Sequence, residues 1–440
     1  MTKVSVIMPV FNAENYLSIA LDSLVCQTLK DIEIICVDDG STDESAQILE
    51  AYQRNDSRII ILRQENLFAG AARNYGLSVA KGKYLSFLDA DDYFMPTMLE
   101  KAYQNAEMQN ADVVIFGGKS FKDDIKNSNS YPALLREDQI PAGIGFDNVE
   151  KIENLMTITT PAPWNKLFLR TFIERHHLEF QTCKRVNDAY FVEMSLACAE
   201  RIGIVRENLI YYRTGNSNSL QGTNNESPTL FALVFISIQD KLKELHIYEK
   251  VKKSFKNLCL ANCIYNLESI TDADAFEKLY IALQTNIFHE FGLEENNPEN
   301  YYNRYAYDMY CYIRSHSPIQ YWMYRYNQKL KDAGCKQYLF PYQMVPKGSR
   351  IIIYGGGKVG QAFYKQIKKS RYCDLAAWVD RSVREYEDQV LCAPQNAEWD
   401  KCDYIIIAIE AEETAKSIRK ELYEKYNIYD HKIVWTNPSV

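Results

Sequence analysis

The chain has 440 residues, a formal net charge of −8, and 47% hydrophobic and 25% charged residues, which is typical of a soluble globular protein with two or three domains. The negative charge argues against nucleic acid as the main partner, because binding nucleic-acid phosphates requires a basic surface. The N-terminal apolar run is too short for a signal peptide, and no run of about 18 apolar residues occurs. Eleven scattered cysteines without a C-x-x-C pair favour a reducing compartment.

Residues 3–118 alternate short apolar, β-rich runs with segments of helical pattern, from "VSVIMPV" to "DVVIFGG". This alternation predicts a parallel sheet covered by helices on both faces. Long helical patterns fill 229–345, and strand-helix alternation returns after "FPYQMVPKGSR". We therefore predict an α/β catalytic domain at 1–220, a helical region at 221–345 and a Rossmann-like domain at 346–440. The basic stretch "YEKVKKSFKNLCLANCIYNL" is either a membrane-surface contact or the solvated face of a packed helix.

The predicted strands of the first region end in polar residues. Because the carboxyl ends of parallel strands form the ligand-binding edge of such sheets, these residues are expected to lie close together. Ser41 and Glu44, in S-x-x-E spacing, predict a capping box that opens the following helix. The residues expected at this edge are Pro9, Phe11, Asn12, Asp38, Asp39, Asp89 and Asp91.

The stretch "YLSFLDADDYF" ends an apolar run in clustered acids. Residues two apart on an extended strand point the same way, so Asp89 and Asp91 should project together while Ala90 turns back. Adjacent carboxylates suit Mg²⁺ or Mn²⁺, which bind one or two carboxylates together with substrate phosphate oxygens. The pattern thus indicates a metal–diphosphate site. The alternative is a solvated loop in which Asp92 caps a helix.

Between the third and fourth predicted strands, Gly70 is expected to free the backbone, and Arg73 falls in the first turns of a helix. An arginine there is either part of a surface ion pair or a partner for a diphosphate.

The motifs from "VSVIMPVFNAENY" through "CVDDGSTDES" to "ARNYGLSVAKGKYLSFLDADDYF" resemble the nucleotide-sugar-binding half of family 2 glycosyltransferases with the GT-A fold. The resemblance is close over 3–118 and looser over 119–220. It implies that Asp39 accepts the N3–H of a uracil with support from Asp38. It also implies that Asp91 contacts the metal directly, with Asp89 nearer the ribose or the donor sugar. The other residues that it places near the nucleotide are Pro9, Phe11, Asn12, Glu14 and Arg73.

The resemblance also implies a catalytic base. The family often carries Glu-Asp-x-x-Phe where this chain has Asn187, Asp188, Ala189, Tyr190 and Phe191. Asp188 would take the proton of the acceptor hydroxyl, and one displacement with a single base predicts inversion at the anomeric carbon. Asn187 departs from the usual glutamate, which bears on fine positioning. The alternative for Asp188 is a first-turn acid of the next helix, and Glu193 is then the second candidate base.

Two further segments resemble parts of the same family. In "PAPWNKLFLRTFI", Trp164 would stack on a sugar or belong to the core, and Lys166 would reach a phosphate. In "YYRTGNSNSL", Arg213 would close over the diphosphate or lie in a solvated loop.

Near the C-terminus, "IIIYGGGKVGQ" places Gly355, Gly357 and Gly360 in G-x-G-x-x-G spacing, and Asp380 closes the next predicted strand. This spacing is typical of a dinucleotide-binding fold. The domain is too short to hold a substrate domain, so we expect a structural or regulatory module, with a bound nucleotide as the alternative.

Together these features predict an inverting glycosyltransferase that depends on Mn²⁺ or Mg²⁺. It would transfer a sugar from a nucleotide-sugar, expected to be a UDP-sugar, to a saccharide or lipid-linked saccharide during synthesis of a surface polysaccharide such as a capsule. The expected location is the cytoplasm or the inner face of the cell membrane. Two alternatives remain: a bifunctional enzyme with a redox C-terminal domain, and a non-catalytic nucleotide-sugar sensor.

Overall fold

The computed structural model describes residues 2–147, 152–215, 224–293, 297–332, 338–382 and 385–438. The chain forms two compact units, each continuous in space but not in sequence. The helical region that the sequence predicts at 221–345 is divided between them. The first unit is Met1–Gly222, Thr229–Asn262 and His289–Arg304, and the second is Thr223–Pro228, Cys263–Phe288 and Tyr305–Val440.

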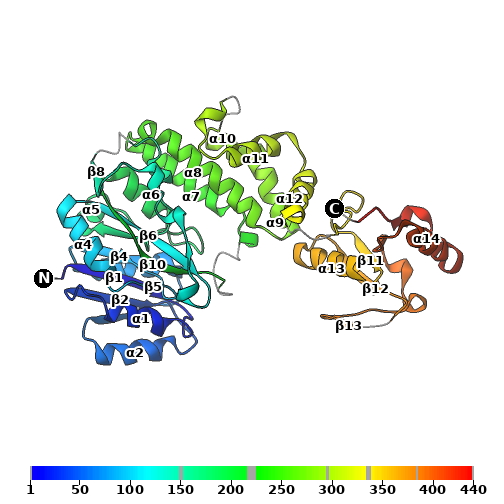
Figure 1. Ribbon diagram of the computed structural model, residues 1–440, viewed down its shortest axis with the longest axis horizontal. Coiled ribbons are helices and arrows are strands. Elements are labelled where there is room, and N and C mark those ends of the chain that lie inside the picture. Colours follow the sequence, from blue (N-terminus) through cyan, green and yellow to red (C-terminus); the bar gives the residue numbers. More distant parts are fainter. Residues whose placement is uncertain are drawn as a thin grey trace. The chain divides into compact units, whose positions relative to one another are not determined.

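The first unit is built on a mixed sheet (Figure 1). Its strand order is β3-β2-β1-β4-β9-β6-β10-β5. Its N-terminal half is parallel, because β1 pairs with β2 and β4, and β2 pairs with β3, all in parallel. The strands are β1 Val4–Val10, β2 Ile32–Asp38, β3 Ile59–Arg63, β4 Tyr84–Phe87, β5 Tyr93–Phe94, β6 Val113–Phe121, β9 Lys166–Leu169 and β10 Arg201–Arg213, with the short β7 Asn129–Ser130 and β8 Gly145–Asp147 paired to β6 and β10.

Helices cover both faces of this sheet. Alternate residues of β1, such as Val6 and Met8, join a core with α1, α2 and α4. Ile7 points the other way, against Gly76 of α3, where an added Cβ would lie 2.5 Å from the Ile7 side chain. The prediction of a parallel sheet covered on both faces is confirmed for the N-terminal half. The helices are α1 Leu17–Val25, α2 Ser45–Asn55, α3 Phe68–Val79, α4 Met98–Gln109, α5 Arg170–Arg175 and α6 Ala189–Cys198.

Residues from 230 to 332 are mainly helical, as predicted from the sequence pattern. Among the described residues, no helix is both long enough and apolar enough to cross a membrane. The helices are α7 Leu230–Glu244, α8 Tyr248–Ser269, α9 Ala273–Ala282, α10 Phe288–Glu290, α11 Arg304–Ser315 and α12 Pro318–Asp332.

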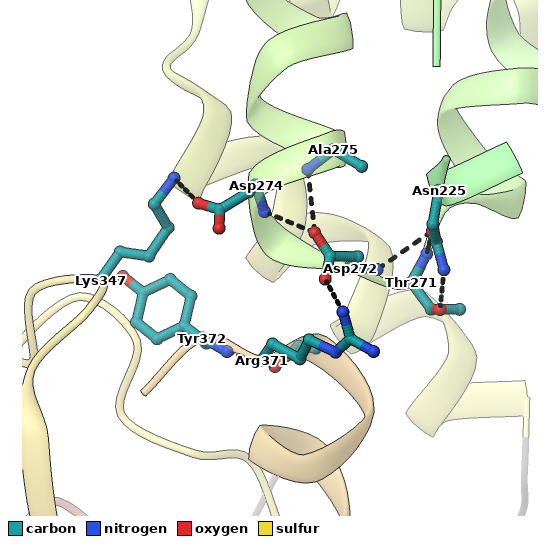
Figure 2. A network of polar contacts seen from close by, with 9 residues as sticks. Asn225, Thr271, Asp272, Asp274, Ala275, Lys347, Arg371 and Tyr372 are labelled. Carbon is teal, nitrogen blue, oxygen red and sulfur yellow. Dashed lines mark hydrogen bonds and ion pairs between the residues drawn. The ribbon is translucent and has the colours of Figure 1, made fainter. Parts of the chain in front are cut away.

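In the second unit, a parallel sheet of order β12-β11-β15-β16 shares a core with α14, and α13 contacts β11. This is the strand-helix alternation that a Rossmann-like domain requires. Arg371 and Lys347 of this domain contact Asp272 and Asp274, respectively, at the start of α9 (Figure 2). Asp272 also caps α9 through the backbone N–H groups of Asp274 and Ala275. The elements are β11 Arg350–Tyr354, α13 Lys358–Ser370, β12 Asp374–Val379, β13 Glu385–Tyr386, β14 Gln389–Val390, β15 Tyr404–Ile407, α14 Glu412–Tyr426 and β16 Ile433–Val434.

Candidate active site

The parallel strands β1, β2 and β4 bring their carboxyl ends to one edge of the sheet. Val10 pairs in register with Asp38, and the N–H of Asp39 donates to the carbonyl of Val10 at 2.8 Å. Beyond β4, the N–H of Leu88 donates to the carbonyl of Ile7 at 3.0 Å. The residues that follow these strands therefore meet at this edge, as the sequence pattern predicts.

The loops after β1 and β2 are joined by polar side chains. The N–H of Asn12 donates to Ser41 Oγ at 3.1 Å, and Asn12 Oδ1 accepts from the N–H of Thr42 at 2.8 Å. Glu14 Oε2 accepts from the N–H of Glu44 at 2.9 Å. Asn12 and Glu14 thus fix the edge of the sheet, whereas Phe11 beside them is 47% exposed.

The predicted capping box is wrong. Helix α2 begins at Ser45 after Glu44, and Glu44 makes no side-chain capping hydrogen bond. The Ser41 hydroxyl is used instead by the N–H of Asn12. The sequence spacing was suitable, but the loop after β1 competes for the same hydroxyl.

Asp38 and Asp39 are both buried at the end of β2. Asp38 Oδ1 accepts from the N–H of Ser41 at 3.0 Å. Asp39 Oδ1 accepts from Gln64 Nε2 at 2.7 Å and from the N–H of Leu67 at 2.9 Å. Asp39 therefore ties the end of β2 to the loop that leads into α3.

That loop carries two exposed apolar residues that sequence reasoning missed. Leu67 and Phe68 are 55% and 39% exposed, and Phe68 has a positive φ of 70°. A bulky residue with a positive φ is a genuine outlier, and such strain clusters at ligand-binding sites. The sequence offered only an unusual apolar pair in a polar loop. Leu67 contacts Asp39 through its backbone N–H.

The acidic loop lies beyond the end of β4, not within the strand as its extended pattern suggested. Asp89 and Asp91 are partly exposed, whereas Ala90 and Asp92 are buried. The expected alternation of side chains therefore holds although the strand ends at Phe87. The alternative in which Asp92 caps a helix is excluded, because α4 begins at Met98 after Thr97.

Arg213 holds this loop from β10. Its N–H donates to Asp92 Oδ1 at 2.9 Å, and its Nε donates to the carbonyl of Asp91 at 2.9 Å. The guanidinium lies 4.6 Å from the ring centre of Tyr16 and 4.4 Å from that of Phe121. Burial and the neighbouring Asp91 and Asp89 charges raise the pKa of Asp92 well above its usual range. Arg213 is buried against the acidic loop and is not part of a solvated loop.

Arg73 connects the acidic loop to the predicted base. This buried guanidinium contacts Asp89 Oδ1 at 2.7 Å through Nη2 and Asn187 Oδ1 at 2.9 Å through Nη1. It also lies 5.3 Å from the ring centre of Phe180. The structure thus brings Asp89 and the Asn187–Asp188 pair to one place.

Asp188 is the residue before α6, but its side chain makes no capping hydrogen bond. Burial raises the pKa of the Asp188 carboxyl, and the nearby Arg73 guanidinium opposes that shift. The residue remains partly exposed. A carboxyl with a raised pKa that is still reachable from solvent has the properties of a general base.

Trp164 and Lys166 differ in their surroundings. Trp164 stacks on Tyr212 with ring centres 5.0 Å apart, and it is buried. Lys166 is completely buried, and four oxygens lie between 2.7 and 3.1 Å from Nζ, on Thr159, Thr160, Ala162 and Asn165. The expectation that Lys166 reaches a phosphate is therefore wrong, because this ammonium is enclosed by its own loop.

Glu193, the second candidate base, is also completely buried, and neither of its carboxylate oxygens has a hydrogen-bond partner among the residues that the structure describes. Burial raises the pKa of Glu193 to about 8 and lowers the pKa of Lys166 to about 7. A carboxyl without exposed surface cannot meet an acceptor hydroxyl, so the geometry favours Asp188.

A metal ion here would need ligands from outside the protein. Within the part of the chain that the structure describes, no group of three His, Cys, Asp or Glu side chains is arranged to hold one. Asp89 and Asp91 are partly exposed carboxylates, and such groups suit a cation whose coordination is completed by phosphate and water oxygens.

The C-terminal glycine loop has the predicted placement after β11 and before α13. Gly355 has φ +120°, and an added Cβ at Gly360 would overlap the carbonyl oxygen of Gly355. Asp380 accepts from the N–H of Gly356 through Oδ2 and from the N–H of Ser382 through Oδ1. Nothing lies within 4 Å of a Cβ added at Gly357. Nucleotide binding at these residues stays a prediction.

Comparison with known proteins assigns the first unit to a family. The profile of glycosyl transferase family 2 matches residues 5–174. Glycosyltransferase GlyG of Streptococcus pneumoniae is 32% identical over 215 residues, which are 48% of this chain and 70% of GlyG. Glycosyltransferase GlyA of the same organism is 32% identical over 48% of this chain, but the match covers only 30% of GlyA. Two other curated relatives are covered over 62% of their lengths.

The fold is also found in a solved structure. Residues 1–349 of S. aureus TarS in complex with UDP-GlcNAc align with a TM-score of 0.57 at 21% identity, over 77% of this chain and 93% of that one. The shared arrangement supports the GT-A fold that the motifs implied. On its sequence match to GlyG and to the family profile, this chain belongs to glycosyl transferase family 2.

Proposed function

We propose that the chain transfers a sugar from a UDP-sugar to a saccharide or lipid-linked saccharide acceptor, with inversion at the anomeric carbon, in the synthesis of a surface polysaccharide. The observation that carries this proposal is the position of Arg73. Its guanidinium contacts Asp89 of the acidic loop and Asn187, which directly precedes Asp188. These contacts support a single site that contains the proposed donor-binding acids and the candidate base.

The donor nucleotide is proposed to bind at the edge formed by β1, β2 and the loop before α3. Asp39 supplies a buried carboxylate that can accept the N3–H of uracil, with Asp38 holding the adjoining backbone. The exposed side chains of Phe11, Leu67 and Phe68 offer apolar surface for a base or ribose. The S. aureus TarS structures in complex with UDP and with UDP-GlcNAc support a uridine nucleotide by analogy of fold.

Asp91 and Asp89 are proposed to hold a divalent cation together with the donor diphosphate. Such a cation, Mn²⁺ or Mg²⁺, neutralises the charge that develops on the leaving diphosphate. Arg213 keeps the acidic loop in place through the carbonyl of Asp91. Arg73 adds a fixed positive charge beside Asp89.

Asp188 is proposed to accept the proton of the acceptor hydroxyl as that oxygen attacks the anomeric carbon. The bond to the diphosphate breaks as the new glycosidic bond forms, and the proton passes to the carboxylate. A single attack from the side opposite the leaving group inverts the anomeric centre.

The test is a donor screen that measures UDP release from UDP-GlcNAc, UDP-glucose and UDP-galactose, each with and without Mn²⁺. Water serves as the acceptor when no saccharide is added. NMR of the first sugar formed reports the anomer, and a β-sugar from an α-linked donor is expected. Retention of the α-anomer would contradict the single-displacement mechanism, and tight UDP binding without any release would favour the sensor alternative.

A further inference from the structure

One face of α3 holds the segment that leads to Asp188. Gly70, Arg73 and Asn74 are three and four residues apart, so they lie on the same face of the helix. All three contact the segment from Phe180 to Asn187. This segment, defined here as the base loop, ends directly before Asp188.

Asn74 makes the most specific contact. Its Nδ2 donates to the carbonyl of Phe180 at 2.8 Å, and its Oδ1 accepts from the N–H of Phe180 at 2.9 Å. One side-chain amide therefore satisfies both backbone groups of a residue 106 positions away. Buried backbone groups need such partners, so this pairing fixes where the base loop starts.

Gly70 allows the loop to approach closely. An added Cβ would overlap the carbonyl oxygen of Gln181 and would lie 3.1 Å from Asn187 Cβ. A glycine inside a helix costs about 1 kcal/mol relative to alanine. The close approach of the base loop explains why α3 carries a glycine here, which differs from the expectation that Gly70 frees the backbone.

The base loop is itself closed and strained. The N–H of Gln181 donates to the carbonyl of Asn187 at 3.1 Å, and Asn187 Nδ2 donates to the carbonyl of Cys183 at 3.2 Å. Between them, Val186 has a φ of 58°, an outlier for a β-branched residue. Strain of this kind persists only when the surroundings hold it, and the α3 face supplies that hold.

The same helix reaches the proposed donor site. The N–H of Leu67, at its N-terminus, donates to Asp39 at 2.9 Å, and Arg73 contacts Asp89 at 2.7 Å. Donor-binding groups and the base loop are thus attached to one rigid element. We propose that Gly70 and Asn74 are positioning residues that set the place of Asp188 relative to the donor, an inference that rests on the proposed function.

The test uses Asn74→Ala and Gly70→Ala in the full chain. Asn55→Ala is the matched control, because Asn55 of α2 donates to the carbonyl of Ala51 in its own helix. Three quantities are measured: UDP affinity in the presence of Mn²⁺, UDP release from the UDP-sugar that the wild type consumes, and amide hydrogen exchange of residues 180–188. Should Gly70→Ala fail to fold, Asn74→Ala carries the test alone.

We expect Asn74→Ala to leave UDP affinity within threefold of wild type, to increase exchange at 180–188 and to lower the rate of UDP release by about 100-fold, the loss that a shift of about 1 Å can cause. Asn55→Ala should match the wild type in all three. Unchanged exchange and unchanged release in Asn74→Ala would overturn the inference. So would a fall in UDP affinity as large as the fall in rate. If the wild type neither binds nor releases UDP, the proposed function is contradicted. The exchange data would still test whether Asn74 holds the base loop in place.

Discussion

The chain contains two sheet edges that look alike in sequence and differ in structure. In the first unit, the parallel strands β2 and β4 lead into acids at the same edge of the sheet. In the C-terminal domain, β11 runs into a glycine loop, and β12 is followed by Asp380. Asp380 is occupied by the N–H groups of its own domain, on Gly356 and Ser382. At the first edge, Asp89 pairs with the guanidinium of Arg73, and Asp92 Oδ2 is buried without a hydrogen-bond partner among the described residues.

Backbone strain also differs between the two edges. Asn12, Phe68 and Val186, all close to the proposed active site, adopt a positive φ without being glycine. At the C-terminal glycine loop the positive φ falls on Gly355, where it costs little. Stored strain and buried charge cost stability, and they persist where function requires them. A motif at the expected place in the fold is therefore weaker evidence of catalysis than the partners and the backbone strain of its residues.

The largest effect is expected from Asp188→Asn. An amide cannot take a proton, so UDP release should fall by about 10²- to 10⁴-fold, the usual contribution of a general base. UDP affinity should stay near the wild-type value. Asp380→Asn is the counterpart at the other edge and should leave the rate unchanged. If Asp380→Asn lost as much rate as Asp188→Asn, the proposed difference in function between the two edges would be contradicted.

Two glycine substitutions test how the glycine loop of the C-terminal domain is packed. Gly360→Ala places a methyl group against the Gly355 carbonyl and 3.3 Å from Trp378 Nε1, so it should destabilise this domain by about 1–3 kcal/mol. Gly357→Ala meets open space and should change stability by no more than about 0.5 kcal/mol. Urea unfolding of both variants measures this. If both variants lost the same free energy of unfolding, the packing of the loop described here would be contradicted.

The buried carboxyl of Glu193 predicts a pH effect in the first unit. Its pKa is about 8 when folded and near 4.3 when unfolded, so between pH 5 and 7 the folded protein keeps a proton that the unfolded chain has released. The free energy of unfolding should therefore fall as the pH rises, by up to about 1.4 kcal/mol per pH unit. Glu193→Gln has no carboxyl to titrate at this position. Its free energy of unfolding relative to that of the wild type should therefore rise from pH 5 to pH 7.

That measurement does not extend above pH 7, because Lys166 loses its proton around that pH and acts in the opposite direction. Urea unfolding at pH 5, 6 and 7 gives the slopes. Parallel curves for the variant and the wild type would mean that Glu193 is ionised in the folded protein.

Local patterns predicted much of the fold and of the donor edge. Features that depend on neighbours in the chain could be predicted from the sequence. They include the apolar strands, the acids after β2 and β4, and the alternation of Asp89 with Ala90. The C-terminal glycines were likewise placed correctly between strand and helix. Ser41 and Lys166 were misjudged because residues of other loops use the hydroxyl and enclose the ammonium.

Contacts between distant residues could not be read in this way. Arg73 meets Asn187 across 114 residues, and Asn74 meets Phe180 across 106. No local spacing encodes such pairs. They follow from the packing of α3 against the base loop, which the sequence shows only as a glycine, an arginine and an asparagine on one helix face.

The most direct test of the account is the thermal stability of the wild type and of Asp91→Ala with UDP, with and without Mn²⁺. A ligand at 100 times its dissociation constant adds about 2.7 kcal/mol to the free energy of unfolding. We predict a Mn²⁺-dependent stabilisation by UDP that is lost in Asp91→Ala and kept in Asp380→Asn. No stabilisation of the wild type by UDP, or equal stabilisation of the wild type and Asp91→Ala, would contradict a metal–diphosphate site at the acidic loop.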